Sequence, residues 1–184
     1  MRFPKVQSDS LSEKEHLNFI YTLFDEYWAN RWSFEITEKC FPLISPRYQK
    51  LTRTSTFGFL RGVIKTEQEH KHIESEILKF RIHGNIERFM QNIQQSIDEI
   101  SKSIAYFYSY IHHYEKFAKL EPFLDSSKFT DESTKNLGNF FRENYENNEF
   151  KIHNGIPIIE NMLKLFGLKF EDQSGGLYIN VLNI

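Results

Sequence analysis

The sequence contains a long run of apolar residues whose spacing alternates between steps of four and three. Its members are Ile86, Met90, Ile93, Ile97, Ile100, Ile104, Phe107, Ile111, Tyr114 and Ala118. Heptad spacing of this kind is typical of a long helix that packs against another helix at a shallow angle. At 1.5 Å per residue, the expected helix over residues 85–119 is roughly 50 Å long. Its apolar face needs a partner, either the upstream segment or a second copy of the same helix.

The nearest candidate partner is the proline-free segment 47–82. His83, Gly84 and Asn85 form a turn signal between the two segments. A matching stripe upstream of the turn passes through Phe80, Ile77, Ile73, His70, Thr66, Val63 and Phe59. The two segments therefore predict an antiparallel helical hairpin. Two glycines, Gly58 and Gly62, each weaken a helix by about 1 kcal/mol relative to Ala, so we expect a kink or a late start there.

A further helix is expected over residues 11–30, preceded by Ser10 and Glu13 at capping-box spacing. Pro42 and Pro46 predict an irregular connector over residues 32–46 with at most one helical turn. Four apolar residues would hold this connector on the core: Phe34, Ile36, Phe41 and Leu43.

Two shorter helices are expected downstream, over residues 131–145 and 157–166. Pro157 near the start and Gly167 just past the end mark the second of them. The alternating tail 168–182, centred on a Gly-Gly turn, predicts a small β-hairpin. The apolar last residue, Ile184, favours a docked terminus or a chain cut before its natural end. The prediction is one mostly α domain over residues 1–184, with a helical hairpin in a small bundle and a C-terminal β-hairpin.

Composition limits the function more than it identifies it. The 184 residues carry a formal net charge of −2, which gives no overall attraction to nucleic acid or to an anionic membrane. No apolar run approaches the ~18 residues of a transmembrane helix, so no membrane insertion is expected. The single cysteine, Cys40, excludes an internal disulfide, and we expect it to be a buried or inert thiol. A cytoplasmic location is expected, with an organelle matrix as the alternative.

The segment Thr66–Glu76, TEQEHKHIESE, raises the question of a metal site. Helical spacing puts His70 on the apolar face, while Glu69, His72 and Glu76 share another face. A dimetal site in a four-helix bundle uses Glu-x-x-His pairs together with inward glutamates from the other helices. Because residues 85–119 carry no such glutamates on the apolar face, we predict a solvated acidic face and no metal or other cofactor. His70 would lie opposite Ile97, Asp98 or Ser101, where a hydrogen bond would satisfy it.

Basic residues without acidic neighbours gather in segment 47–65. They are Arg47, Lys50, Arg53, Arg61 and Lys65. On a helix most of them form one stripe, a candidate site for the phosphates of RNA or DNA. The alternative interpretation is an ordinary solvated face, or one paired with acidic groups such as Asp131 and Glu132.

A helical hairpin with an acidic and basic surface resembles the HEPN-type ribonucleases of bacterial defence systems. That resemblance implies an Arg-x(4–6)-His motif as the source of activity. Here Arg61 precedes His70 by nine positions and Arg142 precedes His153 by eleven, so the motif is absent. The resemblance extends to the fold class alone, and no catalytic residue is assigned.

We therefore expect a non-enzymatic helical interaction protein, an adaptor or a subunit of a larger assembly, that binds a protein partner or forms a homo-oligomer. The predicted contact residues are Tyr106, Tyr110 and His113 on the long helix and Leu177, Ile179 and Val181 in the final strand. The alternative is an RNA-binding module related to HEPN nucleases that uses the basic stripe. A metal-dependent oxidase is the third hypothesis, which elemental analysis of the purified protein would test.

Overall fold

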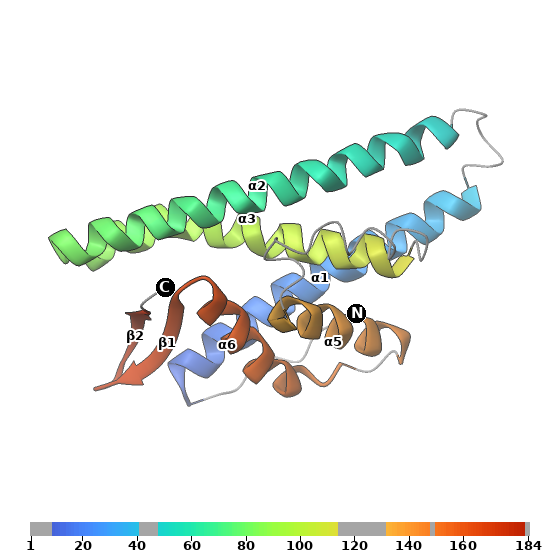
Figure 1. The fold of residues 1–184 in the computed structure, drawn as a ribbon. Helices are drawn as coiled ribbons and strands as arrows, with labels where there is room; N and C mark the ends of the chain where they lie inside the picture. Colours follow the sequence, from blue (N-terminus) through green and yellow to red (C-terminus); the bar gives the residue numbers. More distant parts are fainter. Residues whose placement is uncertain (1–8, 41–47, 114–131, 148–149, 183–184) are drawn as a thin grey trace.

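A long antiparallel helical hairpin runs along one side of the molecule. The computed structural model describes residues 9–40, 48–113, 132–147 and 150–182, without the side chains of Glu38 and of residues 48–63. Helix α2 (Tyr48–His83) and helix α3 (Ile86–His113) lie side by side and reverse direction at Gly84 (Figure 1). Gly84 has a φ of +65°, a left-handed conformation that costs a residue with a Cβ roughly 1–2 kcal/mol. The predicted hairpin of a mostly α fold is confirmed, and Tyr114 and Ala118 lie outside the described residues.

The apolar stripe forms the seam between α2 and α3. Ile93, Ile97, Ile100 and Ile104 on α3 are at most 4% exposed, and so are Ile73 and Ile77 on α2. Ile86 is the exception, at 44% exposed, because it is the first residue of α3 and lies beyond the covered part of the seam. Burial of these isoleucines contributes about 1.5–3 kcal/mol each, which explains why so long a hairpin is stable.

Polar contacts beside the seam fix the register of the hairpin. Lys65 Nζ lies 2.5 Å from Glu99 Oε2, and Ser96 Oγ donates to Glu69 Oε2 at 2.6 Å. Nearer the turn, Asn92 donates to Glu76 Oε2 at 2.6 Å, and Lys79 pairs with the other oxygen of Glu76. The predicted solvated acidic face is therefore wrong for Glu69 and Glu76, because they flank the seam and bond across it. His72 is exposed, as expected.

Helix α1 (Leu11–Cys40) is ten residues longer than the predicted helix 11–30. The segment Arg31–Cys40 contains neither Gly nor Pro, so nothing in it breaks the helix before Pro42. The expectation of an irregular connector over residues 32–46 is wrong for residues 32–40 for this reason, and residues 41–46 lie outside the described part of the chain. Phe34 packs against α3 as expected, but Ile36 is 39% exposed and Cys40 is exposed rather than buried. Phe41 and Leu43 lie outside the described residues.

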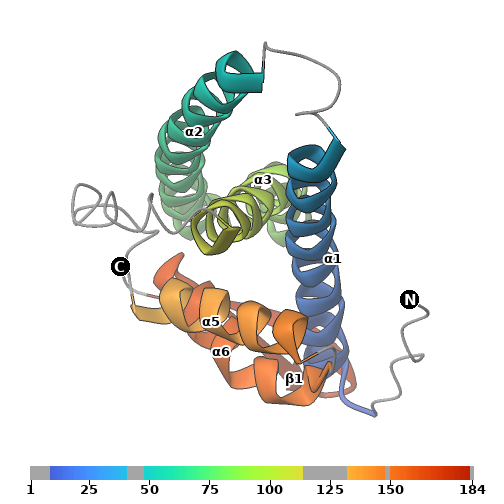
Figure 2. The same cartoon turned by 90° about the vertical axis from the view of Figure 1, so that its right-hand side faces the viewer.

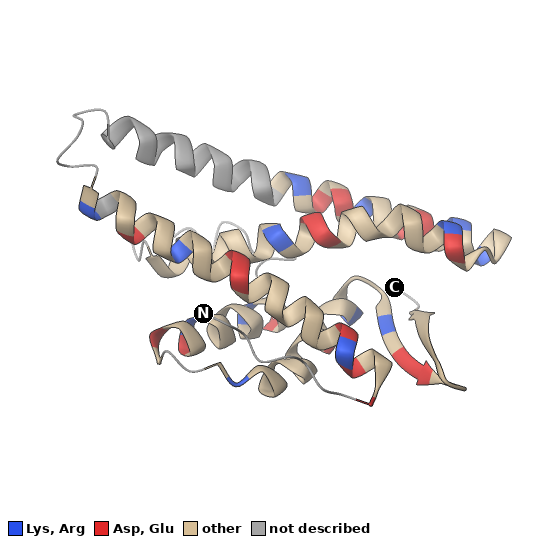
Figure 3. Ribbon diagram, turned by 180° about the vertical axis from the view of Figure 1, so that it is seen from behind, with Lys and Arg blue, Asp and Glu red and all other residues tan. Residues whose placement is uncertain are grey.

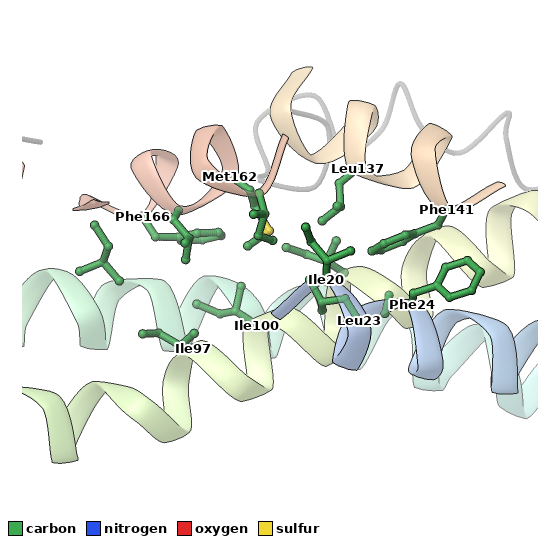
Figure 4. Packing of buried hydrophobic residues seen from close by; sticks show 14 of the residues in the cluster. Ile20, Leu23, Phe24, Ile97, Ile100, Leu137, Phe141, Met162 and Phe166 are labelled. Carbon is green, nitrogen blue, oxygen red and sulfur yellow. The ribbon is translucent and has the colours of Figure 1, made fainter. Parts of the chain in front are cut away.

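Helix α3 lies between α2 on one side and α1 on the other (Figure 2). Below this layer lie α5 (Glu132–Glu146), the 3₁₀ turn η4 (Ile152–Gly155) and α6 (Ile156–Leu165). Their apolar faces meet α1 and α3 in one cluster that includes Ile20, Leu137, Phe141, Met162 and Phe166 (Figure 4). Gly138 permits the close approach of α5 to α3, because a Cβ there would lie 2.3 Å from Tyr108 Cδ1.

Strands β1 (Leu168–Gln173) and β2 (Gly176–Val181) form an antiparallel hairpin at the end of the chain. Its turn residues are Ser174 and Gly175, both with positive φ, so the turn lies one residue before the predicted Gly-Gly turn. Asp172 in β1 accepts hydrogen bonds from Ser10 Oγ, at 2.5 Å, and from the backbone N–H of Ser12, at 2.9 Å. Because Ser10 also caps α1 by accepting from the N–H of Glu13, the hairpin is fixed to the start of that helix.

Candidate functional site

The contact residues predicted on α3 occupy different environments. Tyr106 is 45% exposed and its hydroxyl donates to Glu26 Oε2 at 3.0 Å. Tyr110 is 4% exposed, because the unexpected C-terminal part of α1 places the Phe34 ring against it at 5.7 Å. The same ring lies 5.4 Å from the ring of His113. Tyr110 and His113 thus contact α1 in this structure, and only Tyr106 offers a large exposed surface.

The predicted contact residues in β2 also differ in their exposure. Ile179 and Val181 pack against the core cluster, whereas Leu177 is 36% exposed and its neighbour Tyr178 is 47% exposed. The end of the strand is attached to the helices, since Arg81 Nη2 donates to Leu182 O and the Leu182 N–H donates to Gly167 O. The tip of the hairpin is therefore its accessible part.

The basic stripe is described only in part. Lys65 pairs with Glu99, which neutralises it within the hairpin. The helix includes residues 48–63, but Arg47 and the side chains of Lys50, Arg53 and Arg61 lie outside what the structure describes. Over the rest of α2, cationic and acidic side chains alternate (Figure 3). Phosphate binding by the stripe stays a prediction.

The histidines singled out in the sequence lie apart from one another. His70 is buried in the seam, where its ring meets the Phe166 ring at 5.4 Å and Nδ1 lies 3.6 Å from Glu74 Oε1. His16 is buried at the start of α1, with Nδ1 3.9 Å from Glu160 Oε1. Burial lowers the pKa of His16, which favours the neutral ring. In the described part of the chain, no group of three or more His, Cys, Asp or Glu side chains is placed to hold a metal ion.

An exposed aromatic ridge lies on the outer face of α1, and sequence reasoning missed it. Trp28 and Trp32 stack with ring centroids 5.8 Å apart and an interplanar angle of 15°. Trp28 packs against the core, whereas Trp32 is 52% exposed and Ile36 continues the line at 39% exposed. We call Trp28, Trp32 and Ile36 the α1 ridge. Their spacing of four residues is the signal that predicts it, once the helix is known to extend beyond Asn30.

A second feature is a polar cluster where α1, α3 and α5 meet. The Tyr27 hydroxyl and His112 Nδ1 lie 2.9 Å apart in a hydrogen bond. Burial, with a smaller effect from the charges of Arg142 and Arg31, lowers the pKa of His112 to about 4. Burial also raises the pKa of Tyr27. Both groups are therefore neutral at pH 7.

Arg31 brings a buried cation into this cluster. It is 9% exposed, and its guanidinium carbon lies 5.1 Å from the centre of the Tyr145 ring. The Tyr145 hydroxyl donates to Glu35 Oε1 at 2.7 Å, and burial together with this bond raises the pKa of Tyr145 to about 12. We call Tyr27, Arg31, His112, Arg142 and Tyr145 the Arg31 cluster. Sequence reasoning missed it because its members come from three separate helices.

Comparison with known proteins identifies no relative of this chain. No protein-family profile, no curated protein and no solved structure matches the chain. Within the described residues, no helix combines the length and the apolar character needed to cross a membrane.

Proposed function

We propose that this chain is a non-enzymatic helical interaction protein that binds a protein partner through the α1 ridge. The observation that supports this most strongly is the exposure of Trp32 to 52% while its ring is stacked on an anchored neighbour. A single exposed apolar residue is ordinary on a protein surface. Two stacked indole rings in line with an isoleucine are unusual on a protein surface. They present a continuous apolar strip about 12 Å long on a rigid helix.

The geometry of the α1 ridge suits binding. Trp28 packs on the core and holds the Trp32 ring in a fixed orientation, so little side-chain entropy would be lost when a partner binds. Tryptophan is enriched among the residues that contribute most to binding energy at interfaces. Positions separated by four residues are those that a helix presents to an apolar groove. A partner with such a groove, or a second copy of the chain, would cover the ridge.

The nucleic-acid alternative has less support from the described residues. Lys65 is occupied by Glu99, and the remaining side chains of the basic stripe are not described. We prefer partner binding because Trp32 and Ile36 are exposed side chains on one face of α1.

The test compares three forms of the purified chain: wild type, Trp32→Ala with Ile36→Ala, and the control Ile64→Ala. Ile64 is 60% exposed and lies on α2, so its substitution removes exposed apolar surface away from the ridge. Light scattering gives the oligomeric state, and quantitative mass spectrometry identifies proteins retained from native lysate. In the ridge variant, we expect the affinity of self-association, or the amount of a retained partner protein, to fall at least ~10-fold. A tenfold change in affinity corresponds to about 1.4 kcal/mol. Equal binding by all three forms would contradict the proposal.

Because the substituted side chains are exposed, the ridge variant should fold normally. Surface substitutions of this kind change the free energy of unfolding by about 0.5 kcal/mol or less. Thermal unfolding of each form checks this before binding is compared.

A further inference from the structure

The buried guanidinium of Arg31 has N–H groups without hydrogen-bond acceptors among the described residues. Its Nε and Nη1 atoms are buried and have no hydrogen-bond partner among the described residues. Nε carries one N–H and Nη1 carries two, and a guanidinium is charged at every physiological pH. A buried charge whose N–H groups lack acceptors is strongly disfavoured. The guanidinium lies over the Tyr145 ring and also interacts with the Tyr145 hydroxyl, but neither contact satisfies Nε or Nη1.

The surroundings add positive charge instead of balancing it. Among the described residues, Arg142 bonds to a neutral amide, with Nη2 3.3 Å from Asn139 Oδ1. Neither Arg31 nor Arg142 forms an ion pair with a described residue. One carboxylate beside the cluster, Glu35, already accepts the Tyr145 hydroxyl. The junction of α1, α3 and α5 thus holds two cations, and neither of its nearby carboxylates, Glu35 and Glu146, forms an ion pair with them among the described residues.

We propose that the Arg31 cluster binds the terminal phosphate of a phosphomonoester, with inorganic phosphate as the minimal ligand. Two guanidinium groups balance the two charges of such a phosphate, and guanidinium geometry matches phosphate oxygens. A carboxylate has one charge and two oxygens, fewer than these donors need. This site is distinct from the α1 ridge and does not depend on partner binding there.

The position of the cluster favours a terminal phosphate over an internal one. Arg142 is exposed and Tyr145 is partly exposed, so the cluster reaches the surface along α5. Arg31 lies deeper and its Nε and Nη1 atoms are buried, so a ligand would have to displace the side chains that cover them. A terminal phosphate has three free oxygens to reach inward, whereas an internal phosphodiester is flanked by a sugar on each side.

Isothermal titration calorimetry of the full chain in phosphate-free buffer tests this, with inorganic phosphate, adenosine monophosphate and an RNA oligonucleotide without terminal phosphates as probes. Arg142→Gln removes the exposed cation of the cluster, and Arg88→Gln removes an exposed arginine at the hairpin tip as the matched control. We expect phosphate and the monophosphate to bind wild type and Arg88→Gln equally. Arg142→Gln should weaken both by at least ~10-fold, which corresponds to about 1.4 kcal/mol.

Three results would overturn the proposal. The first is that neither inorganic phosphate nor adenosine monophosphate binds at concentrations up to ~10 mM. The second is that Arg142→Gln and Arg88→Gln bind these ligands equally well. The third is that the oligonucleotide binds as tightly as the phosphate ligands and depends on Arg142. A second variant, Arg31→Met, removes the buried charge and keeps most of the side-chain volume. Without phosphate, it should leave the Tm unchanged or raise it, and it should abolish the rise in Tm that phosphate gives to wild type. A phosphate-dependent rise in Tm that persists in Arg31→Met would also contradict the assignment.

Discussion

At the scale of single residues, His112 shows how packing changes the chemistry of a side chain. Its ring lies among α1, α3 and α5, where it bonds to Tyr27 and stacks obliquely on Tyr108. Burial lowers its pKa to about 4 from the ordinary 6.5, and Arg142 and Arg31 act in the same direction. The folded protein therefore holds this ring neutral, and protonation at this site opposes folding.

This gives a pH dependence of stability with a definite sign. Between pH 6.5 and about 4 the unfolded chain binds the His112 proton and the folded chain does not. The contribution to stability is therefore complete above pH 6.5 and is lost as the pH falls toward 4. The shift corresponds to about 3.5 kcal/mol at most, since one pKa unit is worth about 1.4 kcal/mol.

Urea unfolding of wild type and His112→Gln across this range, in phosphate-free buffer, measures the effect. The variant should lack this component of the decline, while the control His72→Gln, at an exposed position, should retain it. Buried His16 also has a lowered pKa and is present in all three proteins, so the difference between curves isolates His112. Parallel curves for wild type and His112→Gln would show that its proton does not oppose folding.

At the scale of elements, the contact between α3 and α5 depends on a missing side chain. A Cβ on Gly138 would lie 2.3 to 2.8 Å from three atoms of the Tyr108 ring. The Tyr108 side chain is 3% exposed and has little room to move. Close packing here, and not backbone freedom, requires the glycine.

Gly138→Ala should therefore destabilise the fold. An alanine in a helix ordinarily gains about 1 kcal/mol over glycine, but overpacking of this kind costs typically 1–3 kcal/mol or more. Because the contact would be as short as 2.3 Å, we expect an overpacking cost of about 2–3 kcal/mol and a net loss of unfolding free energy of about 1–2 kcal/mol. Adding Tyr108→Leu to Gly138→Ala should recover part of this loss, because the smaller side chain relieves the clash.

Gly84→Ala serves as the comparison. A Cβ at this position meets no atom within 4 Å, so the loss of unfolding free energy comes from the φ of +65° alone. Tyr108→Leu should not rescue it. Denaturant unfolding of the single and double variants gives the two coupling energies. A Gly138→Ala protein as stable as wild type would mean that α5 lies farther from α3 than described.

At the scale of the whole molecule, charge gives no strong preference for a partner class. The chain carries a net charge of −2, and both signs alternate along the described part of the hairpin (Figure 3). Any attraction to a polyanion must come from a local group of cations. The basic stripe at residues 47–65 is the group that the sequence predicts for this role.

Salt titration of RNA binding tests the basic stripe. If the stripe binds RNA, log K should fall linearly with log salt, with a slope of about −0.7 for each phosphate neutralised on a single strand. Arg47→Glu combined with Arg61→Glu should abolish binding. The control Arg88→Glu, at the hairpin tip, should not. Binding that is independent of salt, or equal in both variants, would reject the nucleic-acid alternative in favour of the α1 ridge.

The sequence by itself determined the elements with strong local signals. The α2–α3 hairpin follows from an apolar spacing of four and three that only a helix places on one face, and from a glycine at its turn. The β-hairpin follows from alternation, although the turn lies at Ser174 and Gly175. Periodicity and turn chemistry are properties of neighbouring residues, so a linear sequence contains them.

Tertiary structure alone decided which distant side chains meet. Arg31, His112 and Tyr145 come together because α1 and α5 pack on α3, and no spacing in the sequence encodes those packing angles. The extension of α1 to Cys40 covers Tyr110 and at the same time exposes Trp32. Burial is a property of the assembled molecule, because neighbours from other elements displace the water around each group. The pKa of His112 depends on burial and is therefore decided at the same level.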